Sequence, residues 1–302
     1  MPEIRNHLAE ADRAVGAPED APRSEGSAPP PPSGDEDTRS GDGRVSARTP
    51  ALAAAAPELP PRRTAFIGLG LGLVAAGVLF PFDASIAAAF VRAGESLGGD
   101  LKRELLAFQQ YGGTGSAILL CCIVWALDPP RRRRLLDFGM ATLLVGIAVF
   151  GLKMLIGRPR PKFNDPTAIL GPFGAYPISP EVGVRRAWEL GSGISSDLWS
   201  MPSSHTAHAV LMSVFLYVLY PRLRGIVVAL TVLVALCRPL FSAHWISDVA
   251  AGAGIAFCLS WLAVTRYWGV RALDWLWLRF VDQNATPSYP AIALSRGGHG
   301  RV

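Results

Sequence analysis

Three short stretches of this sequence hold side chains that could bind and transfer a phosphoryl group. They are Lys153-x6-Arg160-Pro161, Pro202-Ser203-Ser204-His205 and Arg238-x5-His244-x3-Asp248. Together they supply three cations, two imidazoles and one carboxylate. Cations neutralise the oxygens of a phosphate, and an imidazole nitrogen can attack its phosphorus. Each stretch lies at the end of an apolar run long enough to cross a membrane, where charged side chains are costly and therefore indicate function.

The three cations are the expected phosphate ligands. Lys153, Arg160 and Arg238 supply positive charge, and the planar guanidinium group of arginine bonds phosphate oxygens in pairs. The hydroxyl of Ser203 can donate another hydrogen bond. Backbone N–H groups near Ser204 can donate further bonds if a helix begins there. Snorkelling to lipid headgroups is the alternative for cations at a membrane surface, and it fits three cations at motif positions poorly.

The two histidines are the expected catalytic groups. His244 and Asp248 are four residues apart and therefore share one face of a helix. Asp248 can accept a hydrogen bond from one imidazole nitrogen and leave the other free to attack, as in a nucleophile with its orienting group. His205 can then protonate the leaving alkoxide. Packing in the core would explain a lone histidine, but it explains two histidines at motif positions less well.

Three further residues near the motifs have open roles. Arg158 and Lys162 could bind either phosphate or lipid headgroups, and the sequence does not separate the two. For His208 we expect support of the site or plain packing rather than catalysis. We expect no metal and no cofactor, because the acidic residues beyond the N-terminal segment are scattered and no His or Cys cluster has ligand spacing.

Six apolar runs must position these motifs. They cover residues 64–82, 105–127, 135–152, 203–220, 224–241 and 246–264. A helix needs about 20 such residues to cross the hydrocarbon core. The expected fold class is all-α, an integral membrane six-helix bundle at residues 61–267, and the second run is interrupted by Gln109 and Gln110. Residues 84–108 should form an amphipathic helix at the outer interface, and residues 268–302 an interfacial helix and a C-terminal tail.

Basic residues between the runs predict the orientation of the bundle. With six spans, one side receives Arg62, Arg63, Arg131 to Arg134, Arg222, Arg224, Arg266 and Arg271. The positive-inside rule makes that side cytoplasmic. Both termini are then cytoplasmic, and all three motifs meet on the non-cytoplasmic face of the membrane, which we expect to be the cell (inner) membrane.

Composition separates a tail from the membrane domain. The chain has 302 residues, half of them hydrophobic, and a net charge of +5. Residues 1–60 are rich in Pro, Ala, Gly, Ser and acids, and cannot bury enough apolar surface to order, so we expect a disordered N-terminal tail. The basic residues flank apolar runs, which favours membrane lipids as partners over nucleic acid. The four cysteines lie in apolar runs and imply no disulfide framework.

The three stretches resemble the type 2 phosphatidic acid phosphatase and vanadium haloperoxidase superfamily, whose motifs are Lys-x6-Arg-Pro, Pro-Ser-Gly-His and Ser-Arg-x5-His-x3-Asp. The resemblance covers about residues 60–265. The first motif matches in full, the second has Ser204 in place of Gly, and the third has Cys237 in place of Ser. The resemblance implies that His244 forms a phosphohistidine and that His205 is the general acid. Ser204 should narrow the site slightly, and Cys237 should weaken one hydrogen bond.

The expected function is hydrolysis of a lipid phosphate monoester or pyrophosphate at the outer leaflet. Phosphatidic acid, phosphatidylglycerol phosphate, undecaprenyl pyrophosphate and lipid A phosphates are all candidate substrates. Haloperoxidases of the superfamily bind vanadate, but six membrane spans favour lipid chemistry. Residues 162–201 should cover the site, and their aromatic side chains could contact acyl or prenyl chains or anchor at the interface. The alternatives are a lipid phosphotransferase of the same chemistry and a non-catalytic anion-binding transporter, which would need no oriented imidazole.

Overall fold

Helices make up most of the computed structural model, which describes residues 59–189 and 196–289. In chain order they are α1 (Arg63–Leu79), α2 (Asp83–Glu95), α3 (Gly99–Phe108), α4 (Thr114–Leu127), α5 (Leu135–Ile156), α6 (Ser204–Leu219), α7 (Arg224–Leu240), α8 (Ile246–Thr265) and α9 (Trp268–Phe280). Short 3-10 helices are η1 (Phe80–Phe82), η2 (Gln109–Gly112), η3 (Pro129–Arg134), η4 (Pro161–Phe163), η5 (Ser196–Leu198) and η6 (Pro221–Leu223). The expected disordered tail lies, except for residues 59 and 60, outside the described residues, as do residues 290–302 of the expected C-terminal tail.

The apolar helices identify an integral membrane protein. Within the described residues, four helical segments are long and apolar enough to span a membrane: Arg63–Glu95, Pro129–Ile156, Pro221–Leu240 and Ile246–Thr265. The pair α3 and α4 makes a fifth if its two bent halves are counted as one span, and α6 is apolar but shorter. The count of six spans therefore stays a prediction.

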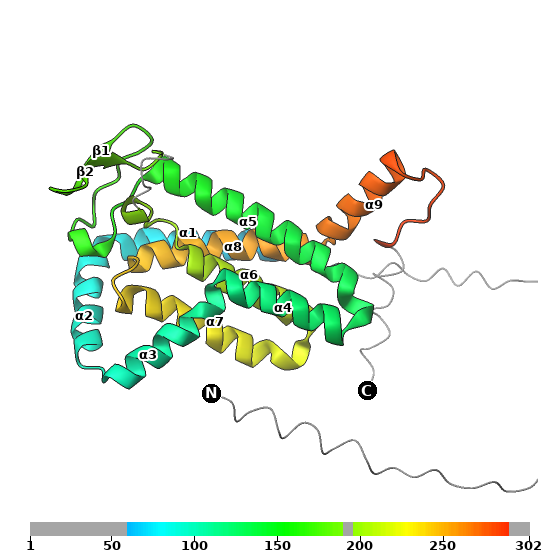
Figure 1. Cartoon of the computed structure of the whole chain (residues 1–302), viewed down its shortest axis with the longest axis horizontal. Coiled ribbons are helices and arrows are strands. Elements are labelled where there is room, and N and C mark those ends of the chain that lie inside the picture. The colour runs from blue at the N-terminus through cyan, green and yellow to red at the C-terminus, as the bar shows by residue number, and fades with distance from the viewer. Residues whose placement is uncertain (1–58, 190–195, 290–302) are drawn as a thin grey trace, which may run out of the picture. The chain divides into compact units, whose positions relative to one another are not determined.

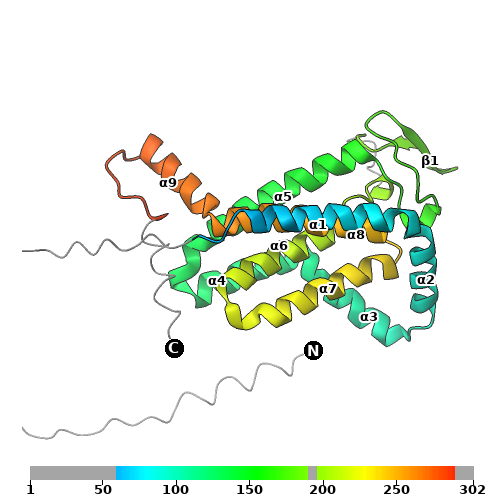
Figure 2. The same ribbon diagram turned by 180° about the vertical axis from the view of Figure 1, so that it is seen from behind.

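Apolar side chains cover the outside of these helices as well as the interior. Leu71 on α1 and Ile147 on α5 are 67% and 63% exposed, which is expected where the surrounding solvent is lipid. The buried core lies among α4, α5, α6 and α8, with Phe138 stacked at a tilt against Phe215, ring centroids 5.1 Å apart. Figures 1 and 2 show α1 running along α8.

The second expected span is broken rather than straight. α3 and α4 are bent by 62° relative to each other, and between them Gly113 has an extended backbone (φ −94°, ψ 161°). The neighbouring Gly112 packs directly on α6, where a Cβ atom would lie 2.2 Å from the carbonyl oxygen of His205. Only glycine allows this approach, so the break brings the chain against the start of α6. The single amphipathic helix expected at residues 84–108 is likewise two helices, α2 and α3.

A small hairpin corrects the expectation of an all-α fold. Strands β1 (Ala175–Ser179) and β2 (Gly183–Arg186) pair antiparallel, with Ala175 opposite Arg186. Gly183 (φ +73°) begins β2 in the left-handed region that glycine favours. The hairpin lies in the long α5–α6 connection, at the end of the bundle where α2 crosses the ends of the long helices (Figure 1).

The opposite end carries α9, and the expected helix after the last span is confirmed. The carboxylate of Asp137 on α5 accepts hydrogen bonds from the N–H groups of Gly269 (2.9 Å) and Val270 (3.1 Å) and forms an ion pair with Arg134 (2.6 Å). Gly269 is required there, since a Cβ atom would lie 1.9 Å from the carbonyl oxygen of Leu136. These contacts fix the first turn of α9 to the bundle.

Candidate active site

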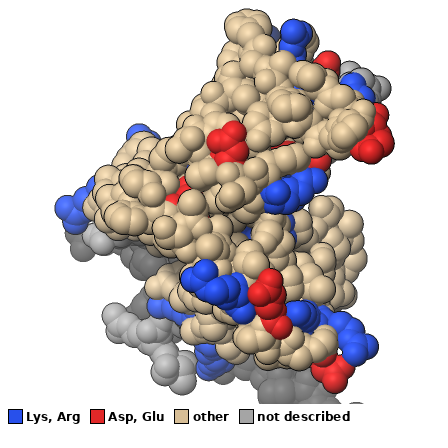
Figure 3. Space-filling view, turned by 90° about the vertical axis from the view of Figure 1, so that its left-hand side faces the viewer, with Lys and Arg blue, Asp and Glu red and all other residues tan. Residues whose placement is uncertain are grey.

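Six of the eight predicted site residues line one cavity of about 400 Å³ at the hairpin end of the bundle. They are Lys153, Arg160, Ser204, His205, Arg238 and His244. The remaining two, Ser203 and Asp248, are fully buried and do not line the cavity. Figure 3 looks onto this end of the molecule, where Lys and Arg side chains (blue) and a few Asp and Glu side chains (red) stand among uncharged residues. Stretches up to 91 residues apart in sequence thus converge on a single space.

The cavity wall is positively charged. Lys153, Arg160 and Arg238 all line it, and no described Asp or Glu does. Lys153 donates from Nζ to the carbonyl oxygen of Trp199, and Arg160 from Nε to that of Ser196 (2.9 Å). Neutral acceptors hold these side chains without neutralising them. Such a site favours an anion, because clustered cations repel one another when the cavity is empty.

Arg238 is oriented by a neutral partner from the broken span. Its Nη1 donates to Oε1 of Gln109 at 2.9 Å, and both side chains are buried. The sequence suggested Gln109 only as an interruption of an apolar run. The bend between α3 and α4 places this amide beside α7, where it fixes the guanidinium group and leaves its charge available.

His244 lies in the turn between α7 and α8, with its side chain buried. Its Nδ1 is 2.5 Å from the carbonyl oxygen of Ser200 and 3.8 Å from Oδ2 of Asp248. A carbonyl oxygen can only accept, so Nδ1 carries the proton and Nε2 has the free lone pair. Burial, opposed by the Asp248 carboxylate, lowers the pKa of His244 to about 3, which keeps the ring neutral. The expected direct bond from Asp248 is thus replaced by a backbone carbonyl.

Asp248 reaches the imidazole ring of His244 indirectly, through residues that it hydrogen-bonds. Its Oδ2 accepts hydrogen bonds from the hydroxyl of Ser200 (2.5 Å) and from the N–H of Trp245 (2.9 Å). Its Oδ1 pairs with Nη1 of Arg158 at 2.7 Å. The carboxylate therefore fixes Ser200, whose carbonyl oxygen binds the ring, and Trp245, which follows His244 in the chain. It also caps the N-terminus of α8.

His205 and Ser204 form the first turn of α6, at the cavity. The first N–H groups of a helix have no acceptor within it, so this end of α6 can donate to an anion. Ser203 instead turns away from the cavity, and its Oγ lies 3.1 Å from Oγ1 of Thr206. The expectation that the Ser203 hydroxyl faces the phosphate is not met in this structure.

The two departures from the family motifs lie in different surroundings. The Ser204 side chain reaches the cavity, where it narrows the space that a glycine would leave. Cys237 on α7 is buried and does not line the cavity, and its Sγ lies 3.8 Å from the carbonyl oxygen of Leu105. The substitution at Cys237 therefore does not alter the cavity wall.

The residues with open roles are also placed. Arg158 is fully buried in ion pairs with Asp83 and Asp248, so it binds neither phosphate nor lipid headgroups here. Lys162 pairs with Asp197 at the surface, 2.7 Å apart, and does not line the cavity. His208 lines the cavity together with the predicted site residues.

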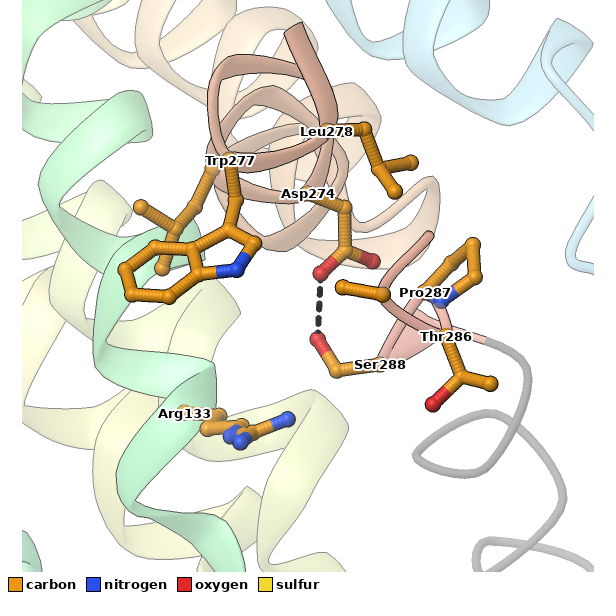
Figure 4. A pocket seen from close by; sticks show the side chains of 9 residues that line it. Arg133, Asp274, Trp277, Leu278, Thr286, Pro287 and Ser288 are labelled. Atoms are coloured by element: carbon orange, nitrogen blue, oxygen red, sulfur yellow. Dashed lines mark hydrogen bonds between the residues drawn. The ribbon is translucent and has the colours of Figure 1, made fainter. Parts of the chain in front are cut away.

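A second hollow of about 250 Å³ lies at the opposite end, beside α9 (Figure 4). Arg133, Asp274 and Trp277 line it, and Asp274 accepts a hydrogen bond from the hydroxyl of Ser288 at 2.6 Å. No predicted site residue contributes to it, and Asp274 would repel an anion. The cavity at the hairpin end is therefore the candidate active site.

A family model and two solved structures are similar to this chain. No curated protein matches the sequence. A crystal structure of Aquifex aeolicus LpxE is similar at 18% identity and a TM-score of 0.42, covering 59% of this chain and 93% of that one. A crystal structure of a transmembrane PAP2 type phosphatidylglycerolphosphate phosphatase from Bacillus subtilis is similar at 20% identity and a TM-score of 0.44, covering 72% and 98%. Residues 134–272, which contain all three motifs, match the model of the PAP2 superfamily.

Proposed function

We propose that this protein is a membrane phosphatase that hydrolyses a lipid phosphate monoester or pyrophosphate through a phosphohistidine. One observation carries the proposal. Nδ1 of the neutral His244 ring is bonded to a backbone carbonyl, which leaves Nε2 free, and the ring lines a cavity that also has three cations in its wall. An anion-binding transporter would need the cations but not the oriented imidazole of His244. A nucleophile needs both.

In the first step, the lone pair on Nε2 of His244 forms a bond to phosphorus, and the bond from phosphorus to the lipid oxygen breaks. His205, as its imidazolium, gives its proton to the leaving oxygen. Positive charge that develops on the ring of His244 is stabilised through Nδ1 by the Ser200 carbonyl and by the nearby Asp248 carboxylate. The cations stabilise the equatorial oxygens of the transferred group.

In the second step, water attacks the phosphorus of the phosphohistidine. Neutral His205 takes a proton from that water, the nitrogen–phosphorus bond breaks, and its electron pair returns to Nε2 of His244. Inorganic phosphate leaves and both histidines regain their starting states. The lipid phosphotransferase alternative differs only in this step, with another hydroxyl in place of water.

The surroundings of the cavity support a lipid substrate, and the proposed reaction uses the three cations in place of a metal. Phe150 and Val149 line the cavity from α5, and Ile147 on the same helix is exposed to the lipid phase. A lipid chain could therefore lie along α5 while its phosphate enters the cavity. Among the described residues, no group of three or more His, Cys, Asp or Glu side chains could hold a metal ion, and the cations take the role that a divalent metal has elsewhere.

We also propose six spans with the cavity on the non-cytoplasmic face. The support is that α6 is apolar and lies among the other spans, and that η3 and η6 carry basic residues at the end remote from the cavity. The positive-inside rule makes that end cytoplasmic. Both termini and α9 are then cytoplasmic, and the substrate is in the outer leaflet.

Two histidine variants test the mechanism. Purified protein in detergent is assayed for phosphate release from phosphatidic acid, phosphatidylglycerol phosphate, undecaprenyl pyrophosphate and a lipid A phosphate. His244→Ala should lose activity by about a thousandfold or more, as expected for a covalent nucleophile, while remaining folded. His205→Ala, given p-nitrophenyl phosphate, should accumulate an acid-labile phosphoenzyme, because p-nitrophenolate leaves without being protonated, whereas the water of the second step must still lose a proton to His205.

The outcomes separate the alternatives. A His244→Ala variant that keeps a tenth of wild-type activity would exclude this residue as the nucleophile. Wild-type protein that binds phosphate without turnover of any lipid would favour the transporter. A phosphorylated hydroxyl acceptor in place of free phosphate would favour the phosphotransferase.

A further inference from the structure

Asp83 is a buried carboxylate outside the three motifs and outside the segment that matches the family. It is the only charged residue between positions 64 and 91 and stands at the start of α2, fully buried. A lone carboxylate after an apolar run is costly unless it is paired. Its partners therefore indicate what it does.

Three donors converge on Asp83, all from the site region. Oδ2 accepts from Nη2 of Arg158 (2.7 Å) and from the hydroxyl of Ser247 (2.5 Å), and Oδ1 accepts from the N–H of Ser247 (3.1 Å). Ser247 belongs to the first turn of α8, three residues after His244. Asp83 thus joins α2 to the helix start that follows His244.

Arg158 lies between two buried carboxylates. Its Nη2 contacts Asp83 and its Nη1 contacts Asp248, each at 2.7 Å, and all three side chains are fully buried. Asp248 in turn accepts a hydrogen bond from the hydroxyl of Ser200, and the backbone carbonyl oxygen of Ser200 accepts one from Nδ1 of His244. A continuous series of hydrogen bonds therefore runs from α2 to the imidazole ring.

The proposal rests on the proposed function. We propose that Asp83 is a positioning residue for His244, which it places through Arg158 and the first turn of α8. Removing one member of a buried charged network leaves the other charges incompletely paired, so they move to new partners. Without Asp83, Arg158 keeps Asp248 as its carboxylate partner, and its other amino group, Nη2, keeps only a neutral acceptor, the carbonyl oxygen of Pro166 at 2.6 Å. Asp248, Ser200 and hence Nδ1 of the nucleophile then lose their defined place.

The test is Asp83→Asn, compared with Asp100→Asn. Asparagine has the size of aspartate, but its amide nitrogen would face a donor whichever way it is turned, because all three partners donate. Asp100 is a matched control. Like Asp83, it lies in the first turn of a helix and pairs with an arginine, but its side chain is 95% exposed. Both variants and the wild type are assayed for kcat and KM on the best lipid substrate and for thermal unfolding.

A positioning role predicts that Asp83→Asn lowers kcat of the folded enzyme by about 10- to 100-fold, as expected for misplaced catalytic groups. KM should stay within about threefold, since Asp83 does not line the cavity. A purely structural role would lower the amount of folded protein and the unfolding temperature, but not kcat per folded molecule. Asp100→Asn should match the wild type.

Every outcome decides the proposal. A folded Asp83→Asn variant with kcat within twofold of wild type, or with a raised KM and unchanged kcat, overturns it. If Asp83→Asn does not fold, Ser247→Ala decides, because it removes only the hydroxyl between Asp83 and Arg158. A threefold or larger fall in its kcat supports the proposal, and a smaller one overturns it. If the wild type and Asp100→Asn release no phosphate, the proposed function fails instead.

Discussion

The buried imidazole of His244 makes the protein sensitive to acid in a way that one substitution can isolate. Burial lowers the pKa of His244 from 6.5 to about 3. Below pH 6.5 the unfolded chain therefore binds a proton that the folded protein does not. Stability falls as pH drops from 6.5 toward 3, because proton binding favours the unfolded state.

The size of the effect follows from the two pKa values. At pH 5.0 the pH is about 1.5 units below the unfolded pKa of 6.5, while the folded histidine is still neutral. Each such unit lowers the free energy of unfolding by about 1.4 kcal/mol. The loss between pH 7.5 and pH 5.0 is thus about 2 kcal/mol. For a domain of this size, that corresponds to about 4–8 °C in unfolding temperature.

The perturbation is His244→Gln, which is polar, of similar size and neutral at every pH. Other titrating groups are common to both proteins, so the difference between their pH responses reports on His244 alone. Thermal unfolding of both in the same detergent at pH 7.5 and pH 5.0 is the assay. The wild type should lose about 4–8 °C more than the variant. Equal losses would refute the reasoning, and would mean that Asp248 or water stabilises the imidazolium.

Three further outcomes are expected. Arg238→Lys, which loses the planar guanidinium group that Gln109 orients, should lower kcat/KM by about 10- to 100-fold, the worth of one charged hydrogen bond; a change below threefold would contradict a role in phosphate binding. Activity should persist in excess EDTA and be blocked by vanadate, whereas loss that magnesium restores would point to a missed metal site. In a cysteine-free background in intact cells, Val184→Cys on the exposed hairpin should react with an impermeant maleimide and Gly225→Cys at the start of α7 should not; the reverse would place the cavity on the cytoplasmic face.

Most residues of the candidate site could be predicted because their signals are local. Cations and histidines recur at fixed spacings in three short stretches. The expectation that His244 and Asp248 share one helical face was wrong, because α8 begins at Ile246 and His244 lies in the turn before it. The apolar runs also give most of the helices, including the weak point at Gln109, where the structure shows a 62° bend. The hairpin was not predicted, since its strands are short and lie in a long connection between helices.

The tertiary structure decided which groups orient the predicted residues. His244 is held by a carbonyl oxygen 44 residues away in the chain, and Arg238 by an amide 129 residues away. A backbone carbonyl has no sequence signature, because every residue has one. Arg158 looked equally suited to phosphate or headgroups, and only the packing of α2 beside α8 gave it Asp83 as a partner. The sequence by itself determined the reactive groups and the apolar elements that carry them, whereas the hydrogen bonds that aim those groups depend on contacts between distant segments, which local patterns do not encode.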